Sequence, residues 1–301
     1  MQDEFIKLAR AGRAFADALT SIPLPPNANT INIPKLTGGT STGAQADLGA
    51  VSSQDITTSL VSFPVITIAG QEDLARQLFD RAVPELADMV LWPDLVSDYN
   101  TKLDVQAISG SGATPNATGA LSQSGVPAGN TLTYTTGSPT LGGLYSKIAG
   151  CVNAIHTTRY LPPDSIWMHP RRWAWCLAQL DSQNRPLIVP HAGGPFNAIG
   201  NLEAVASQAY VGQMMGLPVY VDPSFPVALG AGTNQDVIVV ARMADHWLAE
   251  DDPIKTRVFE EVLSQTLAVR IQCFNYAGLT FGRYPQSLAF VQGTGLSSPS
   301  F

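Results

Sequence analysis

Two stretches near the beginning of the chain alternate hydrophobic and polar residues as half-buried β-strands do. They cover residues 30–34 and 57–68, and this alternation turns one face of each strand toward a core. Residues 36–53 between them consist mostly of Gly, Ser, Thr and Ala. An isolated two-stranded hairpin is marginally stable at best. We therefore expect an extended hairpin over residues 30–68 that either lies against a neighbouring subunit or remains a loose surface hairpin.

Helical periodicity replaces this alternation in the next segment. Hydrophobic residues recur every four positions from Leu74 onward, and acidic residues in the first turn complement the helix dipole. Pro84 and Pro93 are expected to kink the helix without ending it, and Gly110 is expected to close it. The pattern predicts one long, broken helix over residues 71–108.

The pattern of the N-terminal segment predicts a short amphipathic helix over residues 4–19. The prolines within residues 21–26 are expected to end this helix and to exclude the segment from a sheet. We therefore expect residues 1–29 to form an arm that reaches away from its own core to neighbouring subunits. Its deletion is expected to spare the fold of residues 60–295 while weakening assembly.

Helices and strands alternate in the remaining chain, which predicts an α+β protein. Trp167, Trp173 and Trp175 are spaced as core residues. The expected helices cover residues 140–159 and 169–180, and the expected strands cover residues 165–168, 217–221, 237–241 and, in several runs, 255–291.

Charge is scarce along the whole chain. Only 14% of the 301 residues are charged, against about a quarter in an average globular protein, which indicates that much of the surface meets other protein. The 17 basic and 24 acidic side chains give a formal net charge of −7, which argues against a protein that grips nucleic-acid phosphates. No apolar stretch is long enough for a membrane span. The three cysteines are expected to be free thiols in a reducing cytosol.

Motifs that carry catalysis or bind cofactors are absent from the sequence. The acidic residues 250–252 and 260–261 are interpreted as an exposed turn and a solvated strand. The arginines 171–172 are interpreted as an exposed helix start, with a partner's carboxylate or a phosphate as the alternative. We therefore identify no catalytic residue and no cofactor. A metal site is not expected either from the widely spaced His156, His169, His191 and His246.

Several short motifs occur in a characteristic order along the chain. Residues 68–86 lead into the predicted long helix, and the Gly-rich residues 104–119 leave it. Further motifs are residues 167–173, 180–187, 215–220 and 283–288. Together with the order of the predicted elements, they resemble the major capsid proteins of tailed bacteriophages, which share the Hong Kong 97 fold.

The resemblance implies an α+β fold of the Hong Kong 97 type, with an N-terminal arm, an extended hairpin (E-loop), a peripheral domain and an axial domain. The implied boundaries are residues 1–29 for the arm, 30–68 for the E-loop, 69–118 for the peripheral domain with its spine helix, 119–240 for the axial domain, and 241–301 for β-strands that return to the peripheral domain before a C-terminal strand closes onto the axial domain.

The same resemblance implies a structural protein without enzymatic activity or cofactor. The chain would self-assemble into the pentamers and hexamers of an icosahedral head that encloses double-stranded DNA without sequence-specific binding. Portal, scaffolding and decoration proteins are the other implied partners, and no membrane is involved. The implied location is the virion, assembled in the host cytoplasm. Two alternatives stay open: an encapsulin-type shell around a protein cargo, and an α+β hydrolase whose catalytic residues meet only in the folded chain.

The chain departs from the family pattern at the residues used for covalent crosslinking. Some relatives join subunits by an isopeptide bond between a hairpin Lys and an Asn of another subunit, with a buried Glu nearby. Here Lys35 lies only at the base of the hairpin, Ala268 stands at the Asn position and Asn275 at the Glu position. Self-crosslinking is therefore not expected. The contacts between subunits would instead be hydrophobic, through Leu36, Leu48, Val51, Ile56 and Leu60.

Only a short predicted helix precedes the hairpin, whereas many relatives carry an N-terminal scaffolding domain there. Scaffolding is therefore expected from a separate protein or from sequence outside this chain.

Overall fold

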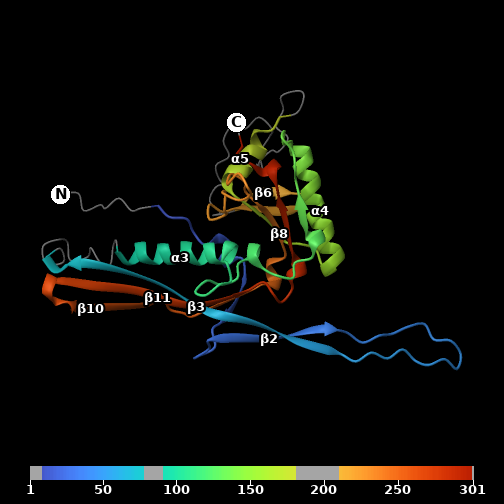
Figure 1. The fold of residues 1–301 in the computed structure, drawn as a ribbon, viewed down its shortest axis with the longest axis horizontal. Coiled ribbons are helices and arrows are strands. Elements are labelled where there is room, and N and C mark those ends of the chain that lie inside the picture. Colours follow the sequence, from blue (N-terminus) through green and yellow to red (C-terminus); the bar gives the residue numbers. More distant parts are fainter. Residues whose placement is uncertain (1–8, 78–90, 181–209, 300–301) are drawn as a thin grey trace, which may run out of the picture.

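The computed structural model describes residues 9–77, 91–180 and 210–299, and these form two six-stranded β-sheets. The first sheet is long and runs beside one helix, whereas the second sheet stands with two further helices at one end of that helix (Figure 1). The α-helices within the described ranges are α1 (Ala14–Asp17), α3 (Trp92–Ser109) beside the first sheet, and α4 (Leu141–Arg159) and α5 (Pro170–Ala178) beside the second.

The two sheets draw their strands from distant parts of the chain. The first sheet has the order β1 (Thr20–Pro23), β9 (Trp247–Glu250), β11 (Ala268–Thr280), β3 (Thr57–Ala75) and β2 (Thr30–Gly38), and β10 (Lys255–Leu263) also pairs with β11. The second sheet has the order β4 (Thr131–Thr133), β12 (Leu288–Gln292), β8 (Ile238–Ala241), β5 (Ser165–Met168), β7 (Leu217–Val221) and β6 (Tyr210–Met214).

Strand β3 continues through the positions where the sequence predicts the start of the long helix, so that prediction is wrong for residues 71–75. These residues pair antiparallel with residues 268–272 of β11. The guanidinium of Arg270 binds the carboxylate of Asp73 directly across the two strands, with N–O distances of 2.7 and 2.8 Å. Strand pairing and this cross-strand ion pair therefore override the local helical periodicity. Residues 78–90 of the predicted helix lie outside the described residues.

Helix α3 confirms the later part of the predicted helix. It begins at Trp92 and ends at Ser109, and Gly110 follows as predicted. A Cβ at Gly110 would collide with the carbonyl oxygen of Ala117, so a side chain is excluded where the chain leaves the helix. Pro93 lies in the first turn of the described helix, a position that tolerates proline.

The second sheet is covered on both faces. Ile166 and Val240 belong to the hydrophobic cluster that includes α4 and α5, whereas Trp167 and Val239 belong to the cluster that includes α1 and α3. Burial on both faces explains why these strands read as short, continuous hydrophobic runs. The helices and strands predicted between residues 140 and 241 are confirmed by α4, β5, α5, β7 and β8.

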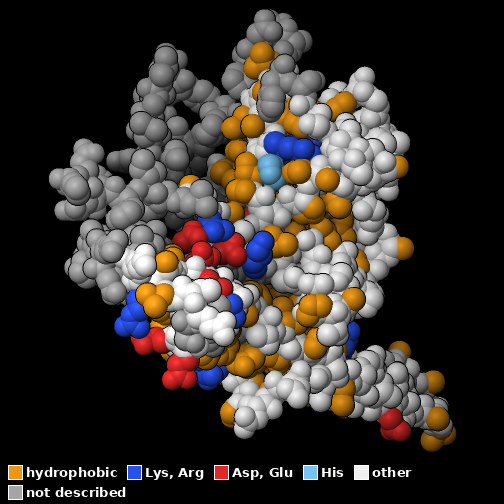
Figure 2. All heavy atoms as spheres, turned by 60° about the vertical axis from the view of Figure 1, so that its left-hand side comes forward, with side chains coloured by type: hydrophobic (Ala, Val, Ile, Leu, Met, Phe, Trp, Pro, Cys, Tyr) orange, Lys and Arg blue, Asp and Glu red, His pale blue; other side chains and the backbone are white. Residues whose placement is uncertain are grey.

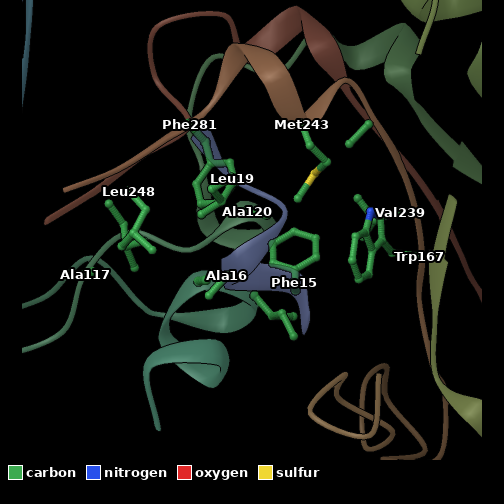
Figure 3. Close-up of a cluster of buried hydrophobic side chains, with 14 of the residues drawn as sticks. Phe15, Ala16, Leu19, Ala117, Ala120, Trp167, Val239, Met243, Leu248 and Phe281 are labelled. Atoms are coloured by element: carbon green, nitrogen blue, oxygen red, sulfur yellow. The ribbon is translucent and has the colours of Figure 1, made fainter. Parts of the chain in front are cut away.

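The cluster between the two sheets is closed by the N-terminal segment (Figure 3). Phe15 is fully buried there. Its ring meets Trp167 edge-on with a centroid distance of 5.1 Å, meets Phe225 edge-on at 5.6 Å, and stacks on Phe281 at 6.3 Å. Leu19 from the same segment is 5% exposed. The N-terminal segment therefore supplies part of the main core.

The prediction that residues 1–29 form an arm away from the core is consequently wrong for residues 14–23. Residues 20–23 form strand β1, which pairs in parallel with β9. The prolines do not prevent this pairing, because β1 is an edge strand and Pro23 is its last residue. Deletion of residues 1–29 is therefore expected to unfold the protein. Residues 1–8 lie outside the described residues.

Replacement of Phe15 tests this core position. We expect Phe15→Ala to lower the free energy of unfolding by about 3–5 kcal/mol, because it removes a fully buried ring and leaves a cavity. Urea unfolding of the unassembled subunit measures the change. Phe259→Ala, on the partly exposed strand β10, is the matched control and should have a much smaller effect. Equal, small effects of both variants would show that the N-terminal segment does not stabilise the core.

Candidate functional site

The predicted hairpin is formed by β2 and the first half of β3. The two strands pair from Thr30 opposite Pro64 to Gly38 opposite Thr57, with an irregularity after Leu36. The inward face is anchored to the first sheet, where Ile33 and Phe63 are buried. A Cβ at Gly278 of β11 would lie 3.0 Å from the Phe63 ring, so the glycine allows this close packing.

Beyond Gly38 and Thr57 the hairpin loses its strand pairing and contacts itself through hydroxyl groups. The hydroxyls of Ser41 and Ser52 lie 2.7 Å apart, and those of Thr37 and Thr57 lie 3.0 Å apart. Leu48 takes a positive φ of 61° in the turn at the free end, a conformation that is rare for residues other than Gly, Asn and Asp. The tip therefore has no hydrophobic core of its own.

Five large hydrophobic residues on the outward face and at the tip of this hairpin face solvent. Leu36 and Leu60 lie on the face opposite to Ile33 and Phe63, as the pairing register requires. Figure 2 shows the hairpin projecting from the body, with hydrophobic side chains and an acidic one near its free end. A group of large exposed apolar side chains on a projecting element is characteristic of an interaction surface. The exposed fractions are 61% for Leu36, 108% for Leu48, 80% for Val51, 58% for Ile56 and 67% for Leu60.

Charges contribute little to this surface. Between Lys35 and Glu72 the only charged residues are Asp47 and Asp55. Exposed ion pairs are worth about 0–1 kcal/mol, so contacts made by the hairpin depend mainly on its hydrophobic side chains. All five residues that the sequence suggested for subunit contact are exposed, and their docking on another subunit remains a proposal.

The positions expected for covalent crosslinking lie in the first sheet. Lys35 is opposite Ser59 at the base of the hairpin, and Ala268 is opposite Ala75 near the far end of β3. Asn275 is fully buried on the face of β11 that also carries Ile271. Lys35 thus lies only at the base of the hairpin, Ala268 stands in place of the crosslinking Asn, and Asn275 stands in place of the Glu. The residues that such a crosslink uses are therefore missing from the expected positions.

Asn275 takes part in a polar network that the sequence analysis missed. Its amide donates to the carbonyl oxygen of Asp251 at 2.7 Å and to the hydroxyl of Tyr99 at 3.3 Å. The Tyr99 hydroxyl in turn donates to the carboxylate of Glu250 at 2.7 Å. Burial, followed by this carboxylate, raises the pKa of Tyr99, so the phenol remains a donor.

The same Glu250 carboxylate ties the N-terminal segment to the first sheet. Both of its oxygens accept from Arg13, at 3.0 and 2.9 Å. Glu250 is therefore half-buried at the end of β9 and not part of a solvated turn, which corrects its sequence-based interpretation. Along β11 buried and partly exposed residues alternate, and Asn275 is a polar residue at one of the buried positions. This polar residue in a hydrophobic pattern is the sequence signal that could have indicated the network.

Arg171 and Arg172 also have partners within the chain. Both bind the buried carboxylate of Asp236, Arg171 through Nε at 2.9 Å and Arg172 through Nη2 at 2.9 Å. Arg172 additionally donates to the carbonyl oxygen of Ser297 at 2.7 Å. The interpretation of an exposed helix start is therefore wrong for Arg172, which is 1% exposed. The alternative interpretation was a carboxylate of a partner protein, but the carboxylate that binds both arginines is Asp236 of the same chain.

Neither metal-binding nor membrane-spanning features occur in the described part of the chain. No group of three or more His, Cys, Asp or Glu side chains gathers there in an arrangement that could hold a metal ion. None of the helices in those ranges is long and apolar enough to cross a bilayer.

The comparison of the sequence with family models identifies the family of the chain. The model of the phage capsid family matches residues 1–292. The chain belongs to the phage capsid family. It is a structural protein of the virion that forms the phage head, which confirms the function and fold class expected from the sequence motifs. The findings favour neither the encapsulin nor the hydrolase alternative.

Solved structures of similar fold cover nearly the whole chain. The structure of Microbacterium phage Oxtober96 is similar with a TM-score of 0.70 and 16% identity, covering 98% of this chain and 94% of that chain. For Gordonia phage Cozz the TM-score is 0.69 and the identity 15%, covering 98% and 90%. For the capsid of a native GTA particle the TM-score is 0.70 and the identity 14%, covering 97% and 94%. No curated protein matches the sequence.

The Arg13–Glu250 contact leads to a test of how the N-terminal segment is held. We expect Glu250→Gln to lower the free energy of unfolding by about 1–2 kcal/mol, because it removes a half-buried, charge-assisted hydrogen bond. Urea unfolding of the unassembled subunit measures this. Glu260→Gln is the matched control, since its 3.5 Å contact with Arg76 is exposed, and it should change stability by less than about 0.5 kcal/mol. A loss no larger for Glu250→Gln than for the control would contradict the role of this pair.

Proposed function

We propose that this capsid protein assembles through pentamers and hexamers into an icosahedral shell, in which each hairpin docks on a neighbouring subunit. The observation that carries the proposal is the set of exposed hydrophobic residues on the projecting hairpin, which find no partner within their own described chain. Membership in the phage capsid family supports it. We further propose that the first sheet with α3 forms the peripheral domain, and the second sheet with α4 and α5 the axial domain.

The expected strength of the docking follows from the hydrophobic area. A Leu, Ile or Val side chain contributes roughly 1.5–3 kcal/mol when it becomes fully buried. The entropy lost on association offsets a large part of the sum over five such residues, so each docked hairpin is a weak contact. A closed shell nevertheless becomes stable, because every subunit makes several contacts at once.

The remaining proposed partners follow from charge and compartment. We propose that the shell encloses double-stranded DNA without binding it tightly, which fits the formal net charge of −7. Assembly in the host cytoplasm is supported by Cys151, Cys176 and Cys273, which are free and buried, as expected in a reducing compartment. Portal, scaffolding and decoration proteins complete the proposed set of partners.

The docking of the hairpin is tested by a charge at its free end. Leu48→Asp should raise the concentration needed for shell assembly by at least about tenfold, because a charge replaces a side chain that becomes buried. The unfolding midpoint of the unassembled subunit should stay unchanged, since Leu48 has no contacts to lose. Sedimentation and electron microscopy measure assembly. The matched control, Ser53→Asp, adds the same charge at an exposed polar position and should assemble normally.

An equal assembly defect in both variants would show that charge as such, and not the loss of a hydrophobic contact, impairs the shell. Shells of normal stability from Leu48→Asp would contradict the proposed docking. Particles that hold a protein cargo and no nucleic acid would contradict the proposed DNA content.

The absence of covalent crosslinks is tested on assembled particles. Shells boiled in detergent should run on a denaturing gel as monomers of 31.9 kDa, the mass of the chain, because the residues for an isopeptide bond are missing from the expected positions. A ladder of covalent oligomers on the gel would show that other residues form the crosslink.

A further inference from the structure

Two carboxylic acids are buried side by side where the N-terminal segment, α3 and the second sheet meet. Asp104 lies on the buried face of α3 and is 0% exposed, and Asp222 directly follows β7 and is 1% exposed. The family match and the docking hairpin do not explain why two acids occupy this hydrophobic junction. Buried acids normally have a positively charged partner or share a proton.

Both carboxyl groups bind the backbone of the N-terminal segment. Asp104 Oδ1 accepts from the N–H of Ala16 at 2.9 Å, and Asp222 Oδ2 accepts from the N–H of Phe15 at 3.3 Å. The first N–H groups of a helix have no intrahelical partner, and no side chain of α1 itself caps its start. The two acids therefore supply the missing acceptors for α1, next to the Phe15 ring in the core.

The two carboxyl groups lie close together, because the N–H groups that they bind belong to the consecutive residues Phe15 and Ala16. Asp222 Oδ1 accepts from the N–H of Ser224 at 2.8 Å, whereas no N–H reaches the second oxygen of Asp104. The second oxygen of Asp104 and the hydroxyl of Ser224 both lack a hydrogen-bond partner among the described residues. Neither acid forms an ion pair with a Lys or Arg of the described residues. Two ionised carboxylates in contact at such a site repel each other strongly, so one proton is required between them.

We propose that Asp104 and Asp222 share one proton and act as a pH-dependent clamp on the N-terminal segment, so that loss of this proton releases residues 14–19 from the junction. Deprotonation adds a second buried negative charge, and hydration of that charge requires the junction to open. The clamp is a property of the single subunit and does not depend on the proposed shell geometry.

The direction of the pH dependence follows from the environment of the pair. Burial, and after it the neighbouring Asp222, raises the pKa of Asp104 to about 8. A group whose pKa is higher in the folded than in the unfolded chain stabilises the fold at low pH, and this contribution is lost as the pH rises through the folded value. The clamp should therefore weaken steadily as the pH rises toward about 8 and weaken no further above that value.

The other ionisable groups around the junction do not produce this dependence. His169 at the start of α5 interacts electrostatically with Asp222 and Arg171, and burial lowers its pKa, so it is neutral in the alkaline range. Burial likewise lowers the pKa of His246, which lies against Phe281, to about 4. At the start of α1, Arg13 binds both Glu250 and Asp17, which raise its pKa and keep it charged throughout this pH range.

Hydrogen exchange of the unassembled protein tests the clamp. The measured quantity is the protection factor of the amides in residues 14–19 between pH 6.5 and 9.5, corrected for the base-catalysed intrinsic rate. In the wild type, opening releases one proton at any pH below the closed-state pKa, so protection should fall about tenfold per pH unit up to about pH 8 and level off above it. In Asp104→Asn, the new amide keeps an acceptor for the Ala16 N–H and offers a donor to Asp222 without a titrating proton, so protection should stay constant over this range.

Asp98→Asn is the matched control on the same helix. Asp98 binds Arg10 at 2.6 Å and is 40% exposed, so this variant should keep the pH dependence of the wild type. Should Asp104→Asn fail to fold, Asp222→Asn provides the same comparison. A wild-type protection factor that does not change with pH, or a fall that persists in the foldable amide variant, would overturn the proposal. Protection that depends on added Ca²⁺ and is lost with a chelator would show that a cation bridges the acids in place of a proton.

Discussion

The two sheets meet at a junction that depends on the N-terminal segment to fill it. Phe15 places one ring against Trp167 of the second sheet and Phe281 at the end of the first. The backbone that carries this ring is polar, and its N–H groups need acceptors inside the core. Asp104 and Asp222 provide these acceptors from α3 and from the loop after β7. Hydrophobic and polar contacts thus hold the same few residues, and the relative position of the two sheets depends on both.

The hairpin, in contrast to the N-terminal segment, leaves most of its large hydrophobic side chains exposed. Its inward face is anchored by Ile33 and Phe63, whereas the five large hydrophobic residues of its outward face and tip have no partner within the described chain. A subunit of this kind can fold by itself and still leave hydrophobic surface for association. The scarcity of charge in the hairpin fits this division, because a strongly charged tip would oppose burial against a like subunit.

Local sequence patterns predicted those elements whose periodicity and burial coincide. In α4, Leu144, Ile148 and Ile155 repeat at helical spacing and are all fully buried. The periodicity of the sequence was therefore sufficient to predict this helix. The exposed hairpin residues were also identified, because a long polar hairpin with scattered hydrophobic residues is unusual in any core.

Long-range pairing explains what the sequence could not show. Residues 71–75 have helical periodicity, yet β11 lies beside them and its backbone completes a strand. The hydrophobic face of the N-terminal segment was visible, whereas the core that covers it comes from residues spread between Ile66 and Phe290. Asp104, on the same helical face as Leu103 and Ala107, was a visible anomaly; its partner Asp222 is brought near only by the fold.

The two regions should respond differently to solution conditions, because different forces hold them. The proposed hydrophobic contacts of the hairpin with a neighbouring subunit would weaken on cooling and under mild denaturant, and would be largely insensitive to ionic strength. The junction contains buried charges and hydrogen bonds, which are screened little by salt but depend on protonation. Cold would therefore act first on the contacts between subunits and leave each subunit folded. A rise in pH toward about 8 would act first inside the subunit, at the carboxyl pair, and would reach the proposed contacts between subunits only through the position of the N-terminal segment.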